Sequence, residues 1–181
     1  MMKPPPADSA HAGAHVIAPL KSSRHAGFTL IELIIAMTIF GILAAIAVPS
    51  FTSLIANHRA SVAASDLYFS LALARSEATK RNARVTLAPT TAGASGWNDG
   101  WQIQAPDPSG AATPLTLENH AAVKGATISG PTTIVYLSSG RIMGTAAPTG
   151  FSISVPSGSS SVQRCVSTDL GGRPLITAVA C

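Results

Sequence analysis

The residues from Phe28 to Val48 read FTLIELIIAMTIFGILAAIAV, an apolar run that constrains how the rest of the chain can be arranged. Its 21 residues include one ionisable side chain, that of Glu32. A helix of this length rises about 1.5 Å per residue and spans roughly 30 Å, the thickness of the hydrocarbon core of a bilayer. We therefore expect residues 28–48 to form a transmembrane helix.

The composition fits one globular domain attached to this run. The chain has 181 residues and a formal charge of +4, and 46% of its residues are hydrophobic while 11% are charged. A disordered chain would be richer in charge, and a disulfide-dense miniprotein would need more than two cysteines. One long apolar run excludes a multi-span membrane protein. The small positive charge does not by itself indicate a nucleic-acid partner.

The flanks of the run predict its orientation and allow three interpretations. Lys21 and Arg24 stand just before it, so the positive-inside rule places the N-terminus in the cytoplasm. A secretory signal cut after Ala47 is one interpretation, but the run exceeds the usual ~7–15 apolar residues and contains an acid. A plain membrane anchor leaves Glu32 unexplained, because a carboxylate there costs about 2.5–3.5 kcal/mol. An acid in a membrane is expected to have a function and a partner.

The third interpretation supplies that partner. Gly27-Phe28-Thr29-Leu30-Ile31-Glu32-Leu33 resembles the processing motif of the type IV pilin and type II secretion pseudopilin superfamily. The resemblance implies that a prepilin peptidase cuts between Gly27 and Phe28, that Phe28 is N-methylated, and that Glu32 and Pro49 act in assembly. The freed ammonium of Phe28 would neutralise Glu32 of a neighbouring subunit, since either ion alone in lipid is costly.

The helix is expected to continue beyond the membrane as far as Asn82. No Gly or Pro interrupts the chain from Ser50 to Val85, and Asn82 is suited to a left-handed C-cap. Apolar residues recur at steps of four or seven, which predicts that this stripe packs on the C-terminal region. We call it the large-residue stripe: Phe51, Ile55, Val62, Phe69 and Leu73, with His58, Ser65 and Ser76 as smaller or polar members.

The helix end and two later motifs narrow the resemblance. The helix ends in Ala-Arg-Ser-Glu-Ala-Thr-Lys-Arg at residues 74–81, and Gly96-Trp97-Asn98-Asp99-Gly100-Trp101 follows. With Gly140-Arg141 and Gly172-Arg173, these segments resemble the H-type pseudopilin and FimT-like minor pilin branch. The basic cluster Arg75, Lys80, Arg81 and Arg84 has two interpretations, helix capping with solvation or contact with a small anion.

After Val85 the pattern changes to short β-type runs between Gly, Pro, Ser and Asn or Asp turns. Their spacing favours antiparallel strands, so the predicted fold is α+β: a long N-terminal helix packed on a β-rich, pilin-like head, with room for two small sheets. Trp97 and Trp101 are expected to pack the helix against the strands. The predicted strands are Val85–Ala88, Trp101–Ala105, Pro114–Glu118, Thr132–Leu137, Phe151–Val155, Val162–Thr168 and Pro174–Val179.

Cys165 and Cys181 are the two cysteines of the chain, and an exported domain favours a disulfide between them, with free thiols as the alternative. If Asp169-Leu170-Gly171-Gly172 turns a hairpin, Cys165 lies opposite about Ile176. Cys181 is then too far along for a simple cross-strand bond. The tail must fold back, or the turn must be longer.

Arg164 and Arg173 flank this loop and are the candidates for DNA contact. In some FimT-like members, which act in DNA uptake, a Gly-Arg-x-Arg loop touches DNA. Here the loop reads Gly172-Arg173-Pro174-Leu175 and lacks the second Arg. Two arginines without an interleaved aromatic residue are also few contacts for a phosphate backbone. A structural role in the hairpin is the alternative to DNA contact.

The sequence contains no nucleophile elbow, phosphate-binding Gly-Lys loop, C-x-x-C or H-E-x-x-H motif, and its acids are scattered singly. We therefore expect no enzyme, no metal site and no cofactor. The resemblance implies a minor subunit that starts or caps a secretion pseudopilus or a type IV pilus. Its expected partners are other pilin or pseudopilin subunits, the prepilin peptidase and an inner-membrane assembly platform.

The expected organisation has four parts. Residues 1–27 are a cytoplasmic leader that is removed, and residues 28–48 are the transmembrane half of the helix. Residues 49–84 are the periplasmic half of the helix, and residues 85–181 are the globular head. The expected location is the bacterial inner membrane with a periplasmic head, and then a filament.

Overall fold

The computed structural model describes residues 27–144 and 150–181 of the chain. The expected leader, including Lys21 and Arg24, lies outside the described residues apart from Gly27. The chain divides into two compact units, residues 1–40 and residues 41–181, and the division falls inside the first helix. The sheets described below all belong to the second unit.

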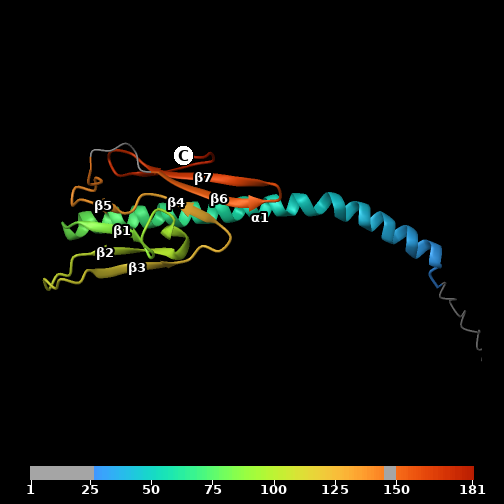
Figure 1. Cartoon of the computed structure of the whole chain (residues 1–181), viewed down its shortest axis with the longest axis horizontal. Helices are drawn as coiled ribbons and strands as arrows, with labels where there is room; N and C mark the ends of the chain where they lie inside the picture. The colour runs from blue at the N-terminus through green and yellow to red at the C-terminus, as the bar shows by residue number, and fades with distance from the viewer. Residues whose placement is uncertain (1–26, 145–149) are drawn as a thin grey trace, which may run out of the picture. The chain divides into compact units, whose positions relative to one another are not determined.

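A single helix, α1 (Leu30–Arg81), forms the N-terminal part of the described chain (Figure 1). It begins after Thr29, whose side-chain Oγ1 accepts a hydrogen bond of 3.2 Å from the backbone N–H of Glu32, as an N-cap does. Its end is marked by Asn82 in the left-handed region, with a φ of 49°. The expected continuous helix and its Asn cap are both confirmed. By length and composition, α1 can cross a membrane, and the apolar window that qualifies it is exposed in the described structure.

The first sheet contains four antiparallel strands in the spatial order β3-β2-β1-β5. A change of register between Ile103 and Gln104 marks a bulge between β2 and β3. A short 3-10 helix, η1 (Gly96–Asp99), precedes β2. The strands are β1 (Val85–Pro89), β2 (Gly100–Ala105), β3 (Leu115–Ala121) and β5 (Ile134–Tyr136).

The second sheet is also antiparallel and has the order β4-β6-β7-β8. All seven predicted strands are present in the two sheets, which confirms the α+β fold with two small sheets. The strand that the sequence did not reveal is β4, which has three residues and pairs with β6. The strands are β4 (Thr127–Ser129), β6 (Gly150–Ser157), β7 (Ser160–Thr168) and β8 (Pro174–Thr177).

The face of α1 that packs on the sheets differs from the one that the sequence predicted. The prediction that the large-residue stripe packs on the C-terminal region is wrong, because Phe51 and Phe69 are 63% and 67% exposed. The buried face is built mainly of alanine, whose small side chain lets strands approach the helix closely. We call it the small-residue face: Ala56, Ala60, Ala63, Ala64, Leu67, Ser70, Leu71, Ala74 and Ala78.

Two tryptophans join the helix and both sheets into one core, as expected. The indole Nε1 of Trp101 donates a hydrogen bond of 2.9 Å to Ser70 Oγ on α1, and both residues are buried. Trp97 meets Phe151 of the second sheet edge-to-face, with ring centroids 4.7 Å apart. Its Nε1 donates to the carbonyl oxygen of Pro131. The two rings therefore fill the space between the elements without leaving an indole N–H unpaired.

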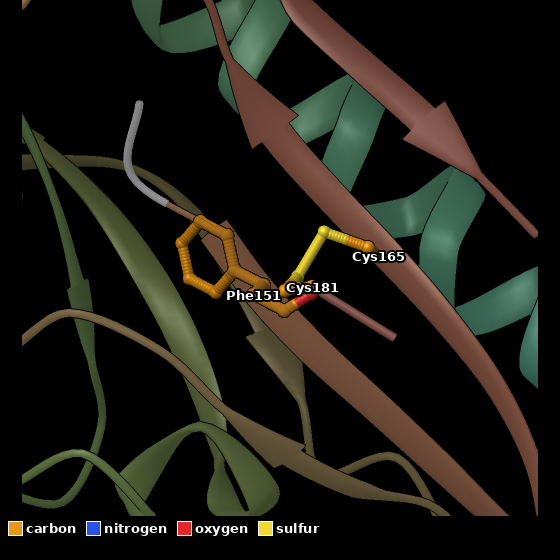
Figure 2. The surroundings of a disulfide bond; sticks show 3 residues. All are labelled: Phe151, Cys165 and Cys181. Atoms are coloured by element: carbon orange, nitrogen blue, oxygen red, sulfur yellow. A yellow bond between two sulfur atoms is a disulfide. The ribbon is translucent and has the colours of Figure 1, made fainter. Parts of the chain in front are cut away.

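A disulfide between Cys165 of β7 and Cys181 anchors the C-terminal tail (Figure 2). The hairpin register pairs Cys165 with Thr177, one residue beyond the expected Ile176. The chain bends after β8, and this fold-back brings the two Cα atoms to 4.9 Å. The expectation that the tail folds back is therefore confirmed.

Candidate functional site

The N-terminal end of the described chain presents the predicted processing residues. Phe28 is 86% exposed, and among the described residues no atom lies within 4 Å of the point that a Cβ on Gly27 would occupy. Glu32 lies in the first turn of α1, where a negative charge is favoured by the helix dipole. Its side chain is exposed and makes no ion pair within residues 27–144 and 150–181. Pro49 falls inside α1, and the helix continues beyond it.

A second surface is the large-residue stripe, which the head leaves uncovered. Its five apolar members are between 38% and 67% exposed, although α1 carries the head on its other side. Large apolar side chains that recur along one exposed face are typical of a protein–protein contact. The stripe continues, within α1, the apolar character of residues 28–48. The part of α1 in the second unit thus presents exposed apolar side chains along the stripe.

The two Gly-Arg pairs come together at one end of the head. A Cβ on Gly172, which has a φ of 77°, would collide with the carbonyl oxygen of Gly140. That same oxygen accepts a hydrogen bond of 3.0 Å from Arg75 Nε on α1. The hydroxyl of Tyr136 donates to the carbonyl oxygen of Gly172, and burial raises the pKa of Tyr136 well above its ordinary value. The glycines therefore serve close packing between two loops and the helix.

The predicted basic cluster divides into parts with different contacts. Arg81 Nε lies 2.7 Å from Glu77 Oε2, and Lys80 Nζ lies 3.4 Å from Glu77 Oε1. The hydrogen bond from Arg81 lowers the pKa of the Glu77 carboxyl, and Lys80 adds to this effect. Arg84 lines a separate hollow beside β1 and β2, with Thr86 and Gln104 among its neighbours. Lys80 and Arg81 therefore pair with Glu77 near the end of the helix, Arg84 lines a hollow, and contact of the cluster with a small anion stays a prediction.

The two candidate DNA-contacting arginines are not brought together. Arg164 lies on β7, and its Nη2 donates to Asn57 Oδ1 on α1 at 3.3 Å. Arg173 precedes β8, where its Nε lies 3.6 Å from Asp169 Oδ2. Thr168 pairs with Pro174, so Arg164 stands four residues, or roughly 13 Å, further along β7 from that point. The pair makes no shared phosphate-binding surface in the structure, and DNA contact by either residue stays a prediction.

Sequence reasoning missed the environment of His120 on β3. Its ring stacks on Trp101 with centroids 4.0 Å apart, and its Nε2 lies 3.4 Å from Asp66 Oδ2 on α1. The local sequence does not indicate this contact, because His120 lies opposite Trp101 only through the pairing of β3 with β2. Within the described ranges, no three His, Cys, Asp or Glu residues are grouped to hold a metal ion.

Two family models match parts of this chain. The family model described as type II transport protein GspH matches residues 63–172, which is more than half of the chain. The model of the prokaryotic N-terminal methylation motif matches residues 22–48. No significant match was found among curated proteins.

Two solved structures share the fold. The type IV minor pilin FimU of Pseudomonas aeruginosa (strain PAO1) matches with a TM-score of 0.51 and 20% identity, over 67% of this chain and 90% of that chain. The minor pseudopilin EpsH from the type 2 secretion system of Vibrio cholerae matches with a TM-score of 0.50 and 16% identity, over 66% of this chain and 97% of that chain. At these identities the likeness shows the fold.

Proposed function

Because the chain belongs to the type II transport protein GspH family, we propose that it is a minor pseudopilin or minor type IV pilin. In this role it is a membrane-anchored structural subunit of a filament, and it works by assembly with other pilin-like subunits. The observation that carries the proposal is the exposed apolar surface of α1, preceded by an N-terminal methylation motif. A monomer would leave the large-residue stripe, which lies beyond residues 28–48, in contact with water.

The processing step that we propose uses residues at the start of the motif. The prepilin peptidase cuts between Gly27 and Phe28, removes residues 1–27 and leaves Phe28 to be N-methylated. The new amine of Phe28 then pairs with Glu32 of a neighbouring subunit. In a medium of low dielectric constant an unpaired carboxylate is costly, so this pairing favours one register between neighbours.

The assembled position of the helix follows from its two faces. Residues 28–48 cross the inner membrane before assembly, and Pro49 allows the helix to adapt on entering the filament. Residues 49–84 carry the head, residues 85–181, on the periplasmic side. The large-residue stripe packs on the helices of neighbouring subunits, where burial of each large apolar side chain contributes about 1.5–3 kcal/mol.

The place of the subunit in the filament is the final part of the proposal. A minor subunit starts or caps the fibre with the help of an inner-membrane assembly platform. The two structural relatives support a minor role, since one is a minor pilin and the other a minor pseudopilin. The fibre of this chain is accordingly a type II secretion pseudopilus or a type IV pilus.

The proposal is tested by producing the full chain with a prepilin peptidase and the filament machinery. Mass spectrometry is expected to find a mature chain that begins with N-methylated Phe28. The Glu32→Ala variant should be cut normally but should not enter filaments. Glu77→Ala removes an acid from the far end of α1 and serves as the matched control, which should enter filaments as the parent does. A mature chain beginning at Val48 would instead establish a secretory signal and overturn the proposal.

A further inference from the structure

The head contains a cleft that the proposed function does not use. It lies between the last turns of α1 and the strand β8, and its volume is about 1010 Å³. Ligand-binding pockets commonly have volumes of about 300–1,000 Å³, so this cleft can hold several residues of a peptide. We call it the α1–β8 cleft; it is lined by Tyr68, Ala72, Arg75, Thr79, Lys80 and Arg173 and by residues 174–176, together with Ser76, Ser139 and Gly140.

The charge of the α1–β8 cleft has one sign. Arg75, Lys80 and Arg173 line it, and none of the described lining residues is Asp or Glu. Arg75 uses its Nε to hold Gly140, and its terminal guanidinium nitrogens make no ion pair with a described residue. Lys80 and Arg173 have carboxylate partners at 3.4 and 3.6 Å, outside the lining. Exposed pairs of this kind contribute little to stability, so an incoming carboxylate can compete for both cations.

One wall of the cleft is an open strand edge. β8 pairs with β7 along one side and stands last in its sheet, so none of the described strands pairs with its other side. Leu175 and Ile176 on this strand are 46% and 42% exposed, and both line the cleft. An edge strand with free main-chain groups and uncovered aliphatic side chains favours the addition of another strand.

We propose that the α1–β8 cleft binds an extended segment of a neighbouring filament subunit, one that carries carboxylate side chains and adds to β8 as a further strand. The inference rests on the proposed function, because it assumes that the chain has neighbours in a filament. Main-chain hydrogen bonds to β8 provide affinity, and Arg173 and Lys80 select acidic residues. The aliphatic wall and the strand edge favour a protein segment over nucleic acid, which needs a longer row of cations.

The test is photo-crosslinking of the full chain in cells that assemble the filament. A photoreactive amino acid replaces Ile176 inside the cleft, and the matched control carries it at Val179, which is 63% exposed and lies outside the lining. We expect Ile176 to give an adduct whose partner peptide, identified by mass spectrometry, comes from a filament subunit and contains Asp or Glu. Arg173→Glu should lower its yield by about fivefold or more, while Lys124→Glu on another loop should not change it.

A third labelled position separates the two proposals. The same photoreactive group at Phe69 reports contacts of the large-residue stripe. Adducts from Phe69 without any from Ile176 would overturn the cleft proposal and leave the proposed function standing, whereas adducts from neither position would count against both. Equal yields at Ile176 and Val179, a yield indifferent to Arg173→Glu, or an adduct with DNA would each overturn the cleft proposal.

Discussion

At the scale of single residues, Gly172 and Trp101 show how close packing and hydrogen bonding hold the head together. Gly172 adopts a φ of 77° and packs its Cα against the carbonyl oxygen of Gly140. Trp101 places a hydrogen-bonding donor against Ser70 in the middle of the core. The first contact requires a residue without a Cβ, and the second requires the indole N–H. No other residue type meets either requirement without rearrangement.

Replacing Gly172 by alanine tests the close approach of the two Gly-Arg loops. Gly110 is the matched control, because its φ of 80° is similar and nothing lies within 4 Å of the point that a Cβ would occupy. We expect Gly110→Ala to lower the free energy of unfolding by about 1–2 kcal/mol through its left-handed backbone alone. Gly172→Ala should cost about 2 kcal/mol more, since its Cβ meets backbone. Urea denaturation of the full chain in detergent measures both, and equal losses would contradict the packing role.

A double-mutant cycle tests the Trp101–Ser70 hydrogen bond. Trp101→Phe and Ser70→Ala should each lower the free energy of unfolding by about 1–3 kcal/mol, because each leaves a buried polar group without its partner. The double variant should lose less than the sum of the two, by about 0.5–1 kcal/mol or more. Strictly additive losses, measured by the same denaturation assay, would show that the bond does not contribute.

At the scale of elements, α1 shows what the sequence reveals and what it hides. Length, lack of Gly and Pro after Ser50 and the Asn82 cap predict the extent of the helix correctly. The buried face is mispredicted, because the spacing of large apolar residues identifies an apolar face but not what covers it. Ala60 and Ala63 face the sheets since strands need close approach there, and this requirement arises from tertiary packing.

Substitutions on the two faces of α1 should affect different properties: folding stability on the small-residue face and filament assembly on the large-residue stripe. Leu71→Ala on the small-residue face should lower the free energy of unfolding by about 2–5 kcal/mol, as deletion of buried methyl groups does. Phe69→Ala on the large-residue stripe should change it by less than about 0.5 kcal/mol. The same Phe69→Ala chain should enter filaments poorly, as measured by its fraction in sheared filaments. Normal incorporation of this variant would contradict the assembly role of the stripe.

The strands were mostly predictable, whereas the cleft was not. Turn residues between short β-type runs mark seven strands, but the three residues of β4 carry too little pattern to be recognised. The processing motif can be read directly, because Gly27, Phe28 and Glu32 are neighbours in sequence. The α1–β8 cleft joins Arg75 and Arg173, which are far apart in the chain, so only the tertiary fold brings them together.

At the scale of the whole molecule, the disulfide ties the C-terminal tail back to β7 of the second sheet. Cys181 Sγ also lies 3.1 Å from the carbonyl oxygen of Phe151, a residue of the core (Figure 2). The bond therefore fixes the tail that follows β8, and with it one end of the strand that forms a wall of the α1–β8 cleft.

Removing this bond should destabilise the head without preventing its folding. The double variant Cys165→Ala/Cys181→Ala should unfold with a free energy about 3 kcal/mol smaller, the value expected for a closed loop of this length. Adding a reductant to the parent chain should reproduce most of the loss, while the double variant should not respond to the reductant. A parent chain whose denaturation midpoint is the same with and without reductant would contradict this stabilising role.

The division of labour between the two faces of α1 has an evolutionary consequence. The alanines that contact the sheets leave no room for a larger side chain, so almost any substitution there destabilises the subunit itself. The exposed aromatic and aliphatic side chains are not limited in this way. They can be substituted as long as a neighbouring subunit can still bind them. Substitution of a few exposed residues during evolution can therefore change which proteins the subunit binds while its head remains intact.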